Sequence, residues 1–377
     1  MRPNVSGEPV SGRYGLAMTT IDPDRLSAMQ FLVFSKLEGA MTAGMIHLGD
    51  QLGLYGALAG AGPVTTVELA ERVGLDERWV REWAYNQGAA RLLDPIVDDG
   101  GVERFALSEE AAAVLADPDA DTTGLGMFRS LPQTMAMLRE LPSSFRTGIG
   151  HDYDSHGDDG LIGLEASFEP WMRAHLVADV LPKLDGIEEA LRTGAAVADI
   201  GCGPGGAVVS MATAYPASTF TGYDISQLAL ARARQRAADG GHSNASFCDP
   251  RVQPLPDDGS LTLVTTFDCI HDMTDPAGMM RAIRAALADD GVWLLVDIKA
   301  ADSFAANVER NPMASLMYGI SVLSCMSSAL SEPGGAGLGT LGLSPDKARA
   351  MAAEAGFTRF RRLDVEHAVN AFYEIRP

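Results

Sequence analysis

The chain has 377 residues, of which 46% are hydrophobic, so it is long enough to form two separate cores. Its formal net charge of −21 creates a negative field that repels nucleic-acid backbones and anionic lipid headgroups, so neither is expected as a partner. Four widely spaced cysteines without a C-x-x-C pair, and the lack of a long apolar segment, predict a cytoplasmic protein with neither a disulfide framework nor a membrane span.

A long amphipathic helix is predicted over residues 25–52, after a disordered leader at residues 1–20. Apolar and small residues recur there at three- and four-residue spacing, which is the spacing of one helix face. Glycine and alanine within that face allow a second helix to approach closely. We therefore expect residues 21–120 to contain a dimerisation element whose partner is a second copy of the chain.

A winged helix is predicted in the same domain, because two short helices are followed by two strands around a turn-forming Asp-Asp-Gly-Gly run. Residues 1–120 hold nine basic and eighteen acidic residues, a net charge of −9, whereas a DNA-reading domain needs a basic stripe. The sequence therefore favours a structural, dimerising module over a DNA-binding one. The expected elements are a helix over 67–73 capped by Thr66, a helix over 77–90 capped by Asp76, and strands at 91–97 and 104–107.

Residues 121–190 are predicted to form a helical linker region that contributes to a substrate pocket. We expect helices over 124–141 and 168–184, separated by an irregular polar loop. Oxygen and nitrogen ligands packed into a short flexible segment rarely hold a metal in fixed geometry, so we predict a polar linker and no metal site. The residues that raise the metal alternative are His151, Asp152, Asp154 and His156.

Strands alternating with helices are predicted for residues 191–377, which indicates an α/β fold with a doubly wound, Rossmann-like sheet. Alternating segments at 358–365 and 368–375 predict an antiparallel C-terminal hairpin at a sheet edge. The expected strands are 196–200, 218–223, 245–248, 261–267 and 292–298, and the expected helices are 205–215, 226–238 and 276–288.

A glycine-rich loop, V-A-D-I-G-C-G-P-G-G at 197–206, follows the first strand of this domain. Its G-x-G-x-x-G spacing suits either a nicotinamide dinucleotide or S-adenosylmethionine, because both need a backbone free of side chains. Asp199 stands just before the glycines, where a diphosphate would be repelled and the ammonium and sulfonium of S-adenosylmethionine would be attracted. The sequence therefore favours S-adenosylmethionine as the cofactor.

Two further carboxylates end the next two strands. Asp224 is placed to accept the ribose hydroxyls, and Asp249 is placed to accept a hydrogen bond from the adenine amino group. Because the carboxyl ends of parallel strands meet at one edge of a sheet, three acidic side chains there would surround a cationic nucleoside.

The run D-I-G-C-G-P-G-G and the acidic ends of the second and third strands resemble the motifs of class I S-adenosylmethionine-dependent methyltransferases. The winged-helix front half resembles the two-domain small-molecule O-methyltransferases. The resemblance covers roughly residues 25–377, and implies that the N-terminal module dimerises and helps to wall the substrate pocket. The cofactor-binding residues it implies are Asp199, Gly201, Cys202, Gly203, Gly206, Asp224, Ile225, Cys248, Asp249 and Asp268.

The fourth strand ends in F-D-C-I-H-D-M-T-D-P, whose H-D pair resembles the H-D-W-S-D motif of plant-type and hydroxyindole O-methyltransferases. The resemblance implies that His271 is the general base, a role that suits an imidazole near neutral pH. Asp272 or Asp275 would orient the imidazole or cap the following helix. Methionine and threonine replace tryptophan and serine in the motif, and the alternative role for His271 is helix capping alone.

An insertion at 302–342 is expected either to cover an apolar, hydroxylated or aromatic substrate or to pack on the sheet. Three other functions remain open: methylation at carbon or nitrogen, a ligand-sensing DNA regulator, and a nicotinamide oxidoreductase. The residues expected to wall the substrate pocket are Phe168, Trp171, Met172, Met313, Met317 and Tyr318.

Overall fold

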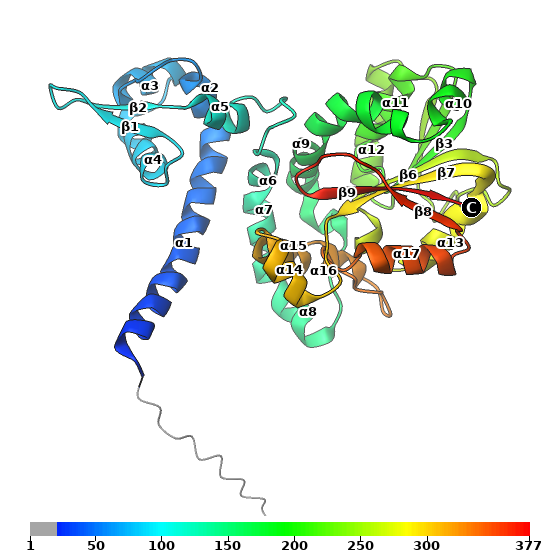
Figure 1. The fold of residues 1–377 in the computed structure, drawn as a ribbon. Coiled ribbons are helices and arrows are strands. Elements are labelled where there is room, and N and C mark those ends of the chain that lie inside the picture. Colours follow the sequence, from blue (N-terminus) through cyan, green and yellow to red (C-terminus); the bar gives the residue numbers. More distant parts are fainter. Residues whose placement is uncertain (1–20) are drawn as a thin grey trace, which may run out of the picture.

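The computed structural model describes residues 21–377, and the predicted leader at 1–20 lies outside the described residues. The described chain forms a mainly helical N-terminal part and a larger α/β part, which lie side by side (Figure 1). Among the helices of the described residues, none is long and apolar enough to cross a membrane.

The first helix, α1 (Pro23–Gln51), confirms the predicted long helix. It begins at Asp22, whose side chain accepts hydrogen bonds from two backbone N–H groups of the first turn. Its N-terminal half projects away from the rest of the chain (Figure 1). Only its C-terminal half is packed, and there Gly49 permits close contact, since a Cβ atom would lie 2.6 Å from the Tyr55 ring.

The winged helix is confirmed, with its two strands paired antiparallel. The first helix of the helix-turn-helix is capped by Thr65 and not by Thr66. The Thr65 hydroxyl accepts a hydrogen bond from the Glu68 N–H, and the Glu68 carboxylate accepts one from the Thr65 N–H. The elements are α2 (Leu54–Leu58), α3 (Thr66–Val73), α4 (Glu77–Ala89), β1 (Asp94–Val97), β2 (Glu103–Ala106) and α5 (Glu109–Leu115).

The predicted continuous helix over 124–141 is wrong, because the segment is divided into short helices and a turn. Pro132 lies in the first turn of one short helix, where its missing N–H costs nothing, and Pro142, just beyond the predicted helix, has the same position in the next. The segment instead forms α6 (Gly126–Arg129), α7 (Leu131–Ala136), the 3₁₀ turn η1 (Met137–Arg139) and α8 (Leu141–Thr147).

The predicted loop and the helix over 168–184 also differ from the structure. A 3₁₀ turn, η2 (Tyr153–His156), leads into α9 (Gly157–His175), which therefore begins well before Phe168 and contains Pro170. Helix α9 continues through the π-turn η3 (Leu176–Val180) and the 3₁₀ turn η4 (Leu181–Lys183). Close packing favours the longer helix: a Cβ atom on Gly126 of α6 would lie 2.3 Å from the α9 backbone.

The doubly wound sheet and its C-terminal hairpin are confirmed. Seven strands are ordered β5-β4-β3-β6-β7-β9-β8; β9 is antiparallel to both neighbours, and the other pairings are parallel. The order reverses at β3, the position where α/β sheets bind ligands. The strands are β3 (Ala196–Ile200), β4 (Thr219–Tyr223), β5 (Ala245–Cys248), β6 (Leu261–Phe267), β7 (Leu287–Ile298), β8 (Arg359–Arg362) and β9 (Asn370–Arg376).

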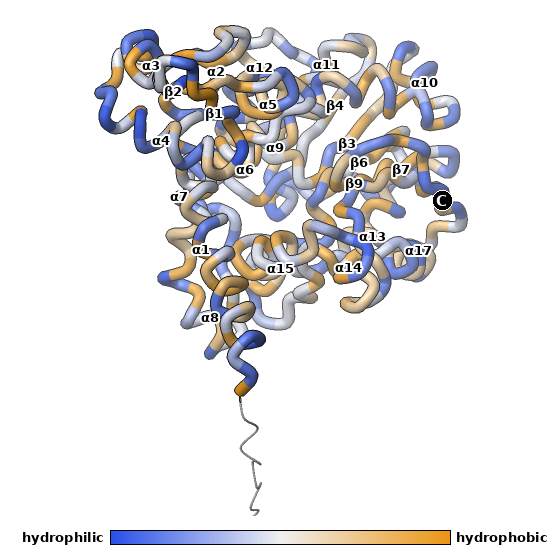
Figure 2. Tube along the Cα trace, turned by 60° about the vertical axis from the view of Figure 1, so that its left-hand side comes forward, coloured by the Kyte–Doolittle hydropathy of each residue, from blue (hydrophilic) through white to orange (hydrophobic). Residues whose placement is uncertain are grey.

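Helices cover both faces of the sheet, and successive strand residues enter different cores. Val197 packs with the helices on one face, and Ala198 packs with those on the other. The central strands β6 and β7 are hydrophobic over most of their length (Figure 2), as expected for strands buried on both faces. One face carries α10 (Ile187–Thr193), α11 (Gly206–Ala214) and α12 (Gln227–Asp239); the other carries α13 (Pro276–Ala286) and α17 (Pro345–Glu354).

The insertion after β7 forms α14 (Phe304–Arg310), α15 (Ala314–Leu323) and α16 (Cys325–Ala329). It is joined to the segment before η2, because the Gly150 N–H donates to the Leu330 carbonyl and the His151 N–H donates to Ser327 Oγ at 2.8 Å. The insertion and residues 150–156 therefore lie together beside the carboxyl ends of the strands.

Candidate active site

The strand register brings the predicted acidic residues to one edge of the sheet. β3 ends opposite the last residue of β4, and β4 ends opposite the last residue of β5. Asp224, Asp249 and Asp268 come directly after β4, β5 and β6. All three therefore stand at the edge that also carries the glycine-rich loop.

The glycine-rich loop forms a cradle without side chains. Gly201 and Gly203 have φ angles of +68° and +51°, a region that favours glycine. A Cβ atom on Gly201 would lie 2.8 Å from Cys269 Sγ, and one on Gly206 would lie 2.5 Å from a carboxylate oxygen of α9. The Gly203 N–H donates to Asp224 Oδ2 at 2.8 Å, which fixes the loop against the end of β4.

Asp199 is a buried acid beside this loop. It is 2% exposed, lies opposite Thr265 across the β3–β6 pair and accepts a hydrogen bond from the Thr265 hydroxyl at 2.6 Å. Burial raises the pKa of Asp199 to about 7, although the bond from Thr265 opposes the rise. A neighbouring cation would stabilise the ionised form, so this carboxylate suits a positively charged ligand.

Asp224 connects the two loops that follow β3 and β4. Its second oxygen, Oδ1, accepts from the Ser226 N–H at 2.8 Å. Burial raises the pKa of Asp224, against the effect of its backbone hydrogen bonds. Ile225 beside it is 47% exposed, and Cys202 of the glycine loop is buried. The carboxylate is thus fixed in position, with lone pairs left for a ligand.

Asp249 is held by a cation of the chain itself. The Arg251 guanidinium and the Gln227 side chain both donate to its carboxylate, and the hydrogen bond from Arg251 lowers the pKa of Asp249. The expected adenine contact therefore requires this carboxylate to accept one more hydrogen bond while it keeps Arg251. The neighbouring Cys248 thiol contacts Gln253 Oε1 at 3.3 Å.

Asp268 takes an unusual backbone conformation, with φ of +50°. It accepts a hydrogen bond from the Asn370 side chain at the start of β9. Burial and the nearby Asp297 carboxylate raise the pKa of Asp268 to about 7. The amide oxygen of Asn370 and Oδ2 of Asp297 are buried without a hydrogen-bond partner. This edge of the site therefore presents several acceptors to a ligand.

His271 lies in η5 (Ile270–Asp272), directly after β6, and is 1% exposed. Its Nδ1 donates to Asp297 Oδ1 at 2.7 Å, near the end of β7. Burial alone would lower the pKa of His271, but the charge and hydrogen bond of Asp297 outweigh it and hold the pKa well above its usual value. Because Nδ1 carries the proton shared with Asp297, Nε2 is the nitrogen left to act on a substrate.

Asp272 points toward the insertion and the residues before α9. The Tyr153 hydroxyl of η2 donates to Asp272 Oδ2 at 2.5 Å. Burial raises the pKa of Asp272 to about 7, although His271 and the Tyr153 hydrogen bond oppose the rise. The next acid of η2, Asp154, accepts from the Ser226 hydroxyl. The η2 turn therefore bridges the loop after β6 and the loop after β4.

The residues predicted to wall the pocket form two groups. In α9, Trp171 lies 4.8 Å from the His175 ring and 4.6 Å from the His367 ring, beside a cavity of about 750 Å³ that Lys299 also lines. None of the three predicted residues at or within α15 lines this cavity: Met313 precedes the helix, and Met317 and Tyr318 lie in it. Phe168 is half-buried and Met172 packs on the sheet core, while Met313 is exposed, Met317 is buried and Tyr318 contacts Phe304.

Asp297, Tyr153, Asn370 and Cys325 belong to the site but were not predicted from the sequence. Asp297 had a detectable signal, because it is a lone acid within the apolar strand V-W-L-L-V-D-I. The other three come from segments far apart in the chain, and only the fold brings them to the end of β6.

Comparison with known proteins identifies both parts of the chain. Residues 191–356 match the family described as "Methyltransferase domain", and residues 40–117 match the "Rv2258c-like winged HTH domain". The chain is 45% identical over 58 residues to a trans-aconitate 2-methyltransferase of Streptomyces coelicolor, covering 15% of this chain and 19% of that protein. It is 24% identical over 160 residues to a ubiquinone biosynthesis O-methyltransferase of Leptothrix cholodnii, covering 41% and 60%. The matches thus span less than two thirds of these relatives.

Solved structures share the arrangement of nearly the whole chain. The mitomycin 7-O-methyltransferase MmcR superposes with a TM-score of 0.66 at 20% identity, covering 94% of this chain and 99% of that one. Human N-acetylserotonin methyltransferase, solved with S-adenosylmethionine, gives 0.63 at 17% identity, covering 95% and 99%. The chain therefore combines a methyltransferase domain with an N-terminal winged-helix domain, and it shares the fold of these methyltransferases of known structure.

Proposed function

We propose that the protein transfers a methyl group from S-adenosylmethionine to a hydroxyl oxygen of a small, largely apolar or aromatic metabolite. The observation that carries this proposal is the pairing of His271 with Asp297 at the sheet edge that also holds the glycine cradle, Asp199 and Asp224. MmcR and the Leptothrix relative are both O-methyltransferases, which supports oxygen as the methylated atom.

The residues of the site fit this cofactor. The glycine-rich loop keeps its backbone free of side chains where the cofactor would lie, and the buried Asp199 suits the cationic methionine end. Asp224 would accept the ribose hydroxyls, and Ile225 and Cys202 would border the nucleoside. When bound, S-adenosylmethionine supplies an electrophilic methyl group on a sulfonium. Asp249 would keep its ion pair with Arg251 and accept from the adenine amino group.

His271 would act on the acceptor hydroxyl. Asp297 fixes the imidazole through Nδ1, so Nε2 is the nitrogen that would take the proton of the acceptor hydroxyl. The imidazolium that forms is stabilised by the Asp297 carboxylate. Alignment of the two reactants supplies the remainder of the acceleration, about 7–11 kcal/mol in well-oriented systems. A carbon or nitrogen acceptor would use the same alignment with less need for the base.

The test of this function is direct. Isothermal titration should show S-adenosylmethionine binding to the full chain, and incubation with isotopically methyl-labelled cofactor and a panel of phenols should give a labelled methyl ether by mass spectrometry. Saturable NADH binding together with no S-adenosylmethionine binding would instead support an oxidoreductase. A labelled product methylated at carbon or nitrogen would keep the cofactor and reject the oxygen acceptor.

The pH dependence of catalysis should report the His271–Asp297 pair. Because only the neutral imidazole can accept a proton, kcat/KM should rise with pH through the pKa of His271, which Asp297 holds above the usual value of about 6.5. The Asp297→Asn variant removes the charge that raises this pKa, so its acidic limb should move to lower pH while its maximal rate falls. Asp290→Asn, an exposed acid of the same strand, should leave the profile unchanged. An unchanged limb in Asp297→Asn would contradict the pairing.

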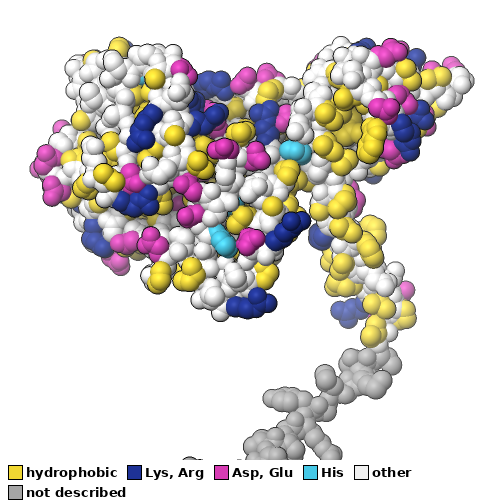
Figure 3. Space-filling view, turned by 180° about the vertical axis from the view of Figure 1, so that it is seen from behind, with side chains coloured by type: hydrophobic (Ala, Val, Ile, Leu, Met, Phe, Trp, Pro, Cys, Tyr) yellow, Lys and Arg dark blue, Asp and Glu magenta, His cyan; other side chains and the backbone are white. Residues whose placement is uncertain are grey.

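The N-terminal domain would serve dimerisation. Helix α1 exposes a long apolar surface (Figure 3), which a monomer in water would rarely keep. The arginines of α4 are paired with acids, Arg78 with Glu82 at 2.5 Å and Arg81 with Glu77 at 2.6 Å, so they are poorly placed to bind phosphates. These features favour a homodimer over a DNA-binding protein. The exposed apolar side chains are Leu26, Met29, Phe31, Leu32, Val33, Phe34, Leu37 and Met41.

Phe31→Glu should convert the dimer to a monomer. Phe31 is 77% exposed, and a glutamate there would place a charge in the middle of the proposed interface. Light scattering coupled to gel filtration should give twice the chain mass for the parent and the chain mass for the variant. Lys36→Glu changes the charge by two units rather than one, at an exposed polar position of the same helix, and this variant should stay dimeric. A parent that is monomeric at all concentrations would refute the interface.

A further inference from the structure

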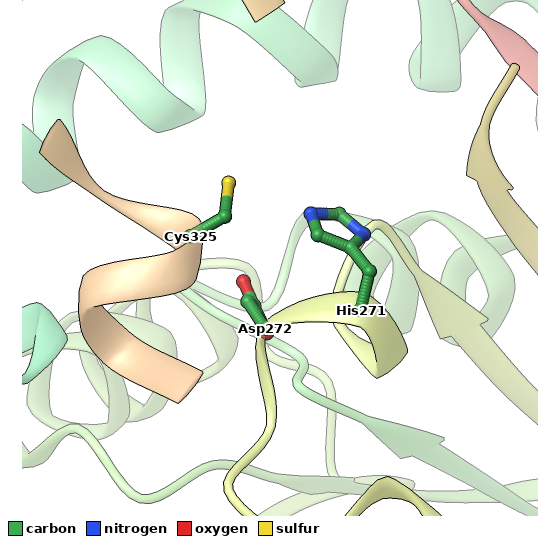
Figure 4. A group of neighbouring side chains, drawn as sticks. All are labelled: His271, Asp272 and Cys325. Atoms are coloured by element: carbon green, nitrogen blue, oxygen red, sulfur yellow. The ribbon is translucent and has the colours of Figure 1, made fainter. Parts of the chain in front are cut away.

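A cluster of metal-ligating side chains lies next to the proposed base. His271 and Asp272 come from η5 and Cys325 begins α16. One ring nitrogen of His271, one carboxylate oxygen of Asp272 and Cys325 Sγ all lie within 4.8 Å of one another. Figure 4 shows the three side chains facing a common space. The Tyr153 hydroxyl oxygen, 2.5 Å from Asp272 Oδ2, adds a fourth candidate ligand atom.

The chemistry of these ligands selects one class of metal ion. Nitrogen, sulfur and oxygen together are the ligands of Zn²⁺ and similar divalent ions, whereas Mg²⁺ and Ca²⁺ take oxygen alone. Histidine ligands of zinc typically donate their other ring N–H to a carboxylate, which fixes the tautomer and raises the basicity of the ligating nitrogen. His271 already has this arrangement, since Nδ1 donates to Asp297 at 2.7 Å and leaves Nε2 free.

The geometry and surroundings are compatible with a tetrahedral site. Zinc–nitrogen and zinc–sulfur bonds of about 2.0–2.3 Å imply roughly 3.5 Å between ligand atoms, so small rotations of the Cys325 and Asp272 side chains would close the present spacing. His271 is 1% exposed, Asp272 is 7% exposed and Cys325 is 8% exposed, so water competes little for these ligands. The net charge of −21 raises the local concentration of cations.

We propose that His271, Asp272 and Cys325, with Tyr153 or a water as fourth ligand, bind a zinc-like divalent cation that inhibits the enzyme. On binding, the Cys325 thiol releases its proton to solvent, as do His271 Nε2 and the Asp272 carboxyl where they are protonated, and the metal occupies the Nε2 lone pair that would otherwise accept the substrate proton. The bound ion also fills the space beside Nε2. Inhibition, but not metal binding itself, rests on the proposed role of His271 as base.

Cobalt provides a spectroscopic test that does not depend on activity. Titration of the metal-stripped full chain with Co²⁺ should produce a thiolate-to-cobalt charge-transfer band that saturates at one equivalent. Cys325→Ser should lose the band, and Cys248→Ser, which changes a thiol outside the cluster, should keep it. Asp297→Asn should weaken metal affinity about 10–100-fold. Circular dichroism and thermal unfolding of each variant report that it is folded, and His271→Gln supplies a second ligand variant.

The outcomes separate this site from the proposed function. A band that is lost in both ligand variants establishes the site. No band in the parent, or a band that persists in Cys325→Ser, overturns it. In methylation assays Zn²⁺ should compete with the acceptor in the parent, and Cys325→Ser should be less sensitive. A cobalt band at this site without inhibition would contradict the base role of His271 and leave the metal site standing.

Discussion

Replacing His271 by glutamine should lower kcat about 10²–10⁴-fold, the usual contribution of a general base. Glutamine can donate to Asp297 from its amide and fill a similar volume, so the variant removes the basic nitrogen without leaving the buried Asp297 oxygen unpaired. The affinity for S-adenosylmethionine should stay close to that of the parent. Rapid-quench single turnovers with the labelled cofactor would measure the chemical step.

The control for this variant is His242→Gln, the same change at a histidine beside the C-terminal end of α12. It should retain the parental kcat. Activity in His271→Gln should not vanish, because positioning of the two reactants remains. If His271→Gln turned over at the parental rate, His271 would have only a structural role. Catalysis would then rest on the alignment of the two reactants alone.

The α/β part could be predicted from the sequence because its signals are local. A parallel strand buried on both faces is largely apolar, and β3 and β6 were predicted with the bounds that the structure shows, as was the edge strand β5. The glycines after β3 mark a conformation that other residues rarely adopt, as the φ of +68° at Gly201 shows. Such features do not depend on distant parts of the chain.

The linker region could not be predicted because its structure is set by tertiary contacts. Gly157, Gly163 and Pro170 all argue against a helix on propensity, yet all lie within α9. Gly163 is used for packing, since a Cβ atom there would lie 2.2 Å from the Ser130 Cβ atom. The contact between α6 and α9 therefore decides the helix, and no local pattern reveals it.

The site divides in the same way. His271 and Asp199 stand in recognisable local motifs, whereas Tyr153 and Cys325 reach Asp272 and His271 only through η2 and α16. The acids at the strand ends also differ in a way that the sequence does not reveal. Within residues 21–377, Asp199 is buried with the Thr265 hydroxyl as its side-chain partner and no cation, whereas Asp249 is bound by Arg251. A cationic ligand should therefore stabilise the carboxylate of Asp199 more than that of Asp249.

The affinity for S-adenosylmethionine should depend on pH through Asp199. In the free protein burial raises the pKa of Asp199 to about 7, so below that pH the carboxyl is mostly protonated. A cationic ligand stabilises the carboxylate, so binding expels a proton and the affinity falls by up to tenfold for each pH unit below about 7. Above that pH the carboxylate is already ionised, and this contribution becomes constant. Titration calorimetry in buffers of different ionisation enthalpy would count the protons released.

Asp199→Asn should weaken cofactor binding by about 10–100-fold, the cost of losing a charge-assisted contact of about 1.5–3 kcal/mol. Its amide can still accept the hydrogen bond from Thr265, so the strand pairing is kept. The number of protons released on cofactor binding should fall by one in this variant. Making both measurements in a His271→Gln background removes the imidazolium of His271 as a second source of released protons. Asp239→Asn, an exposed acid at the end of α12, makes the same change in net charge and should bind as the parent does. An affinity that is flat from about pH 6 to 8 in the parent would mean that the cation does not approach Asp199, because a buried acid with this pKa must respond to a neighbouring positive charge.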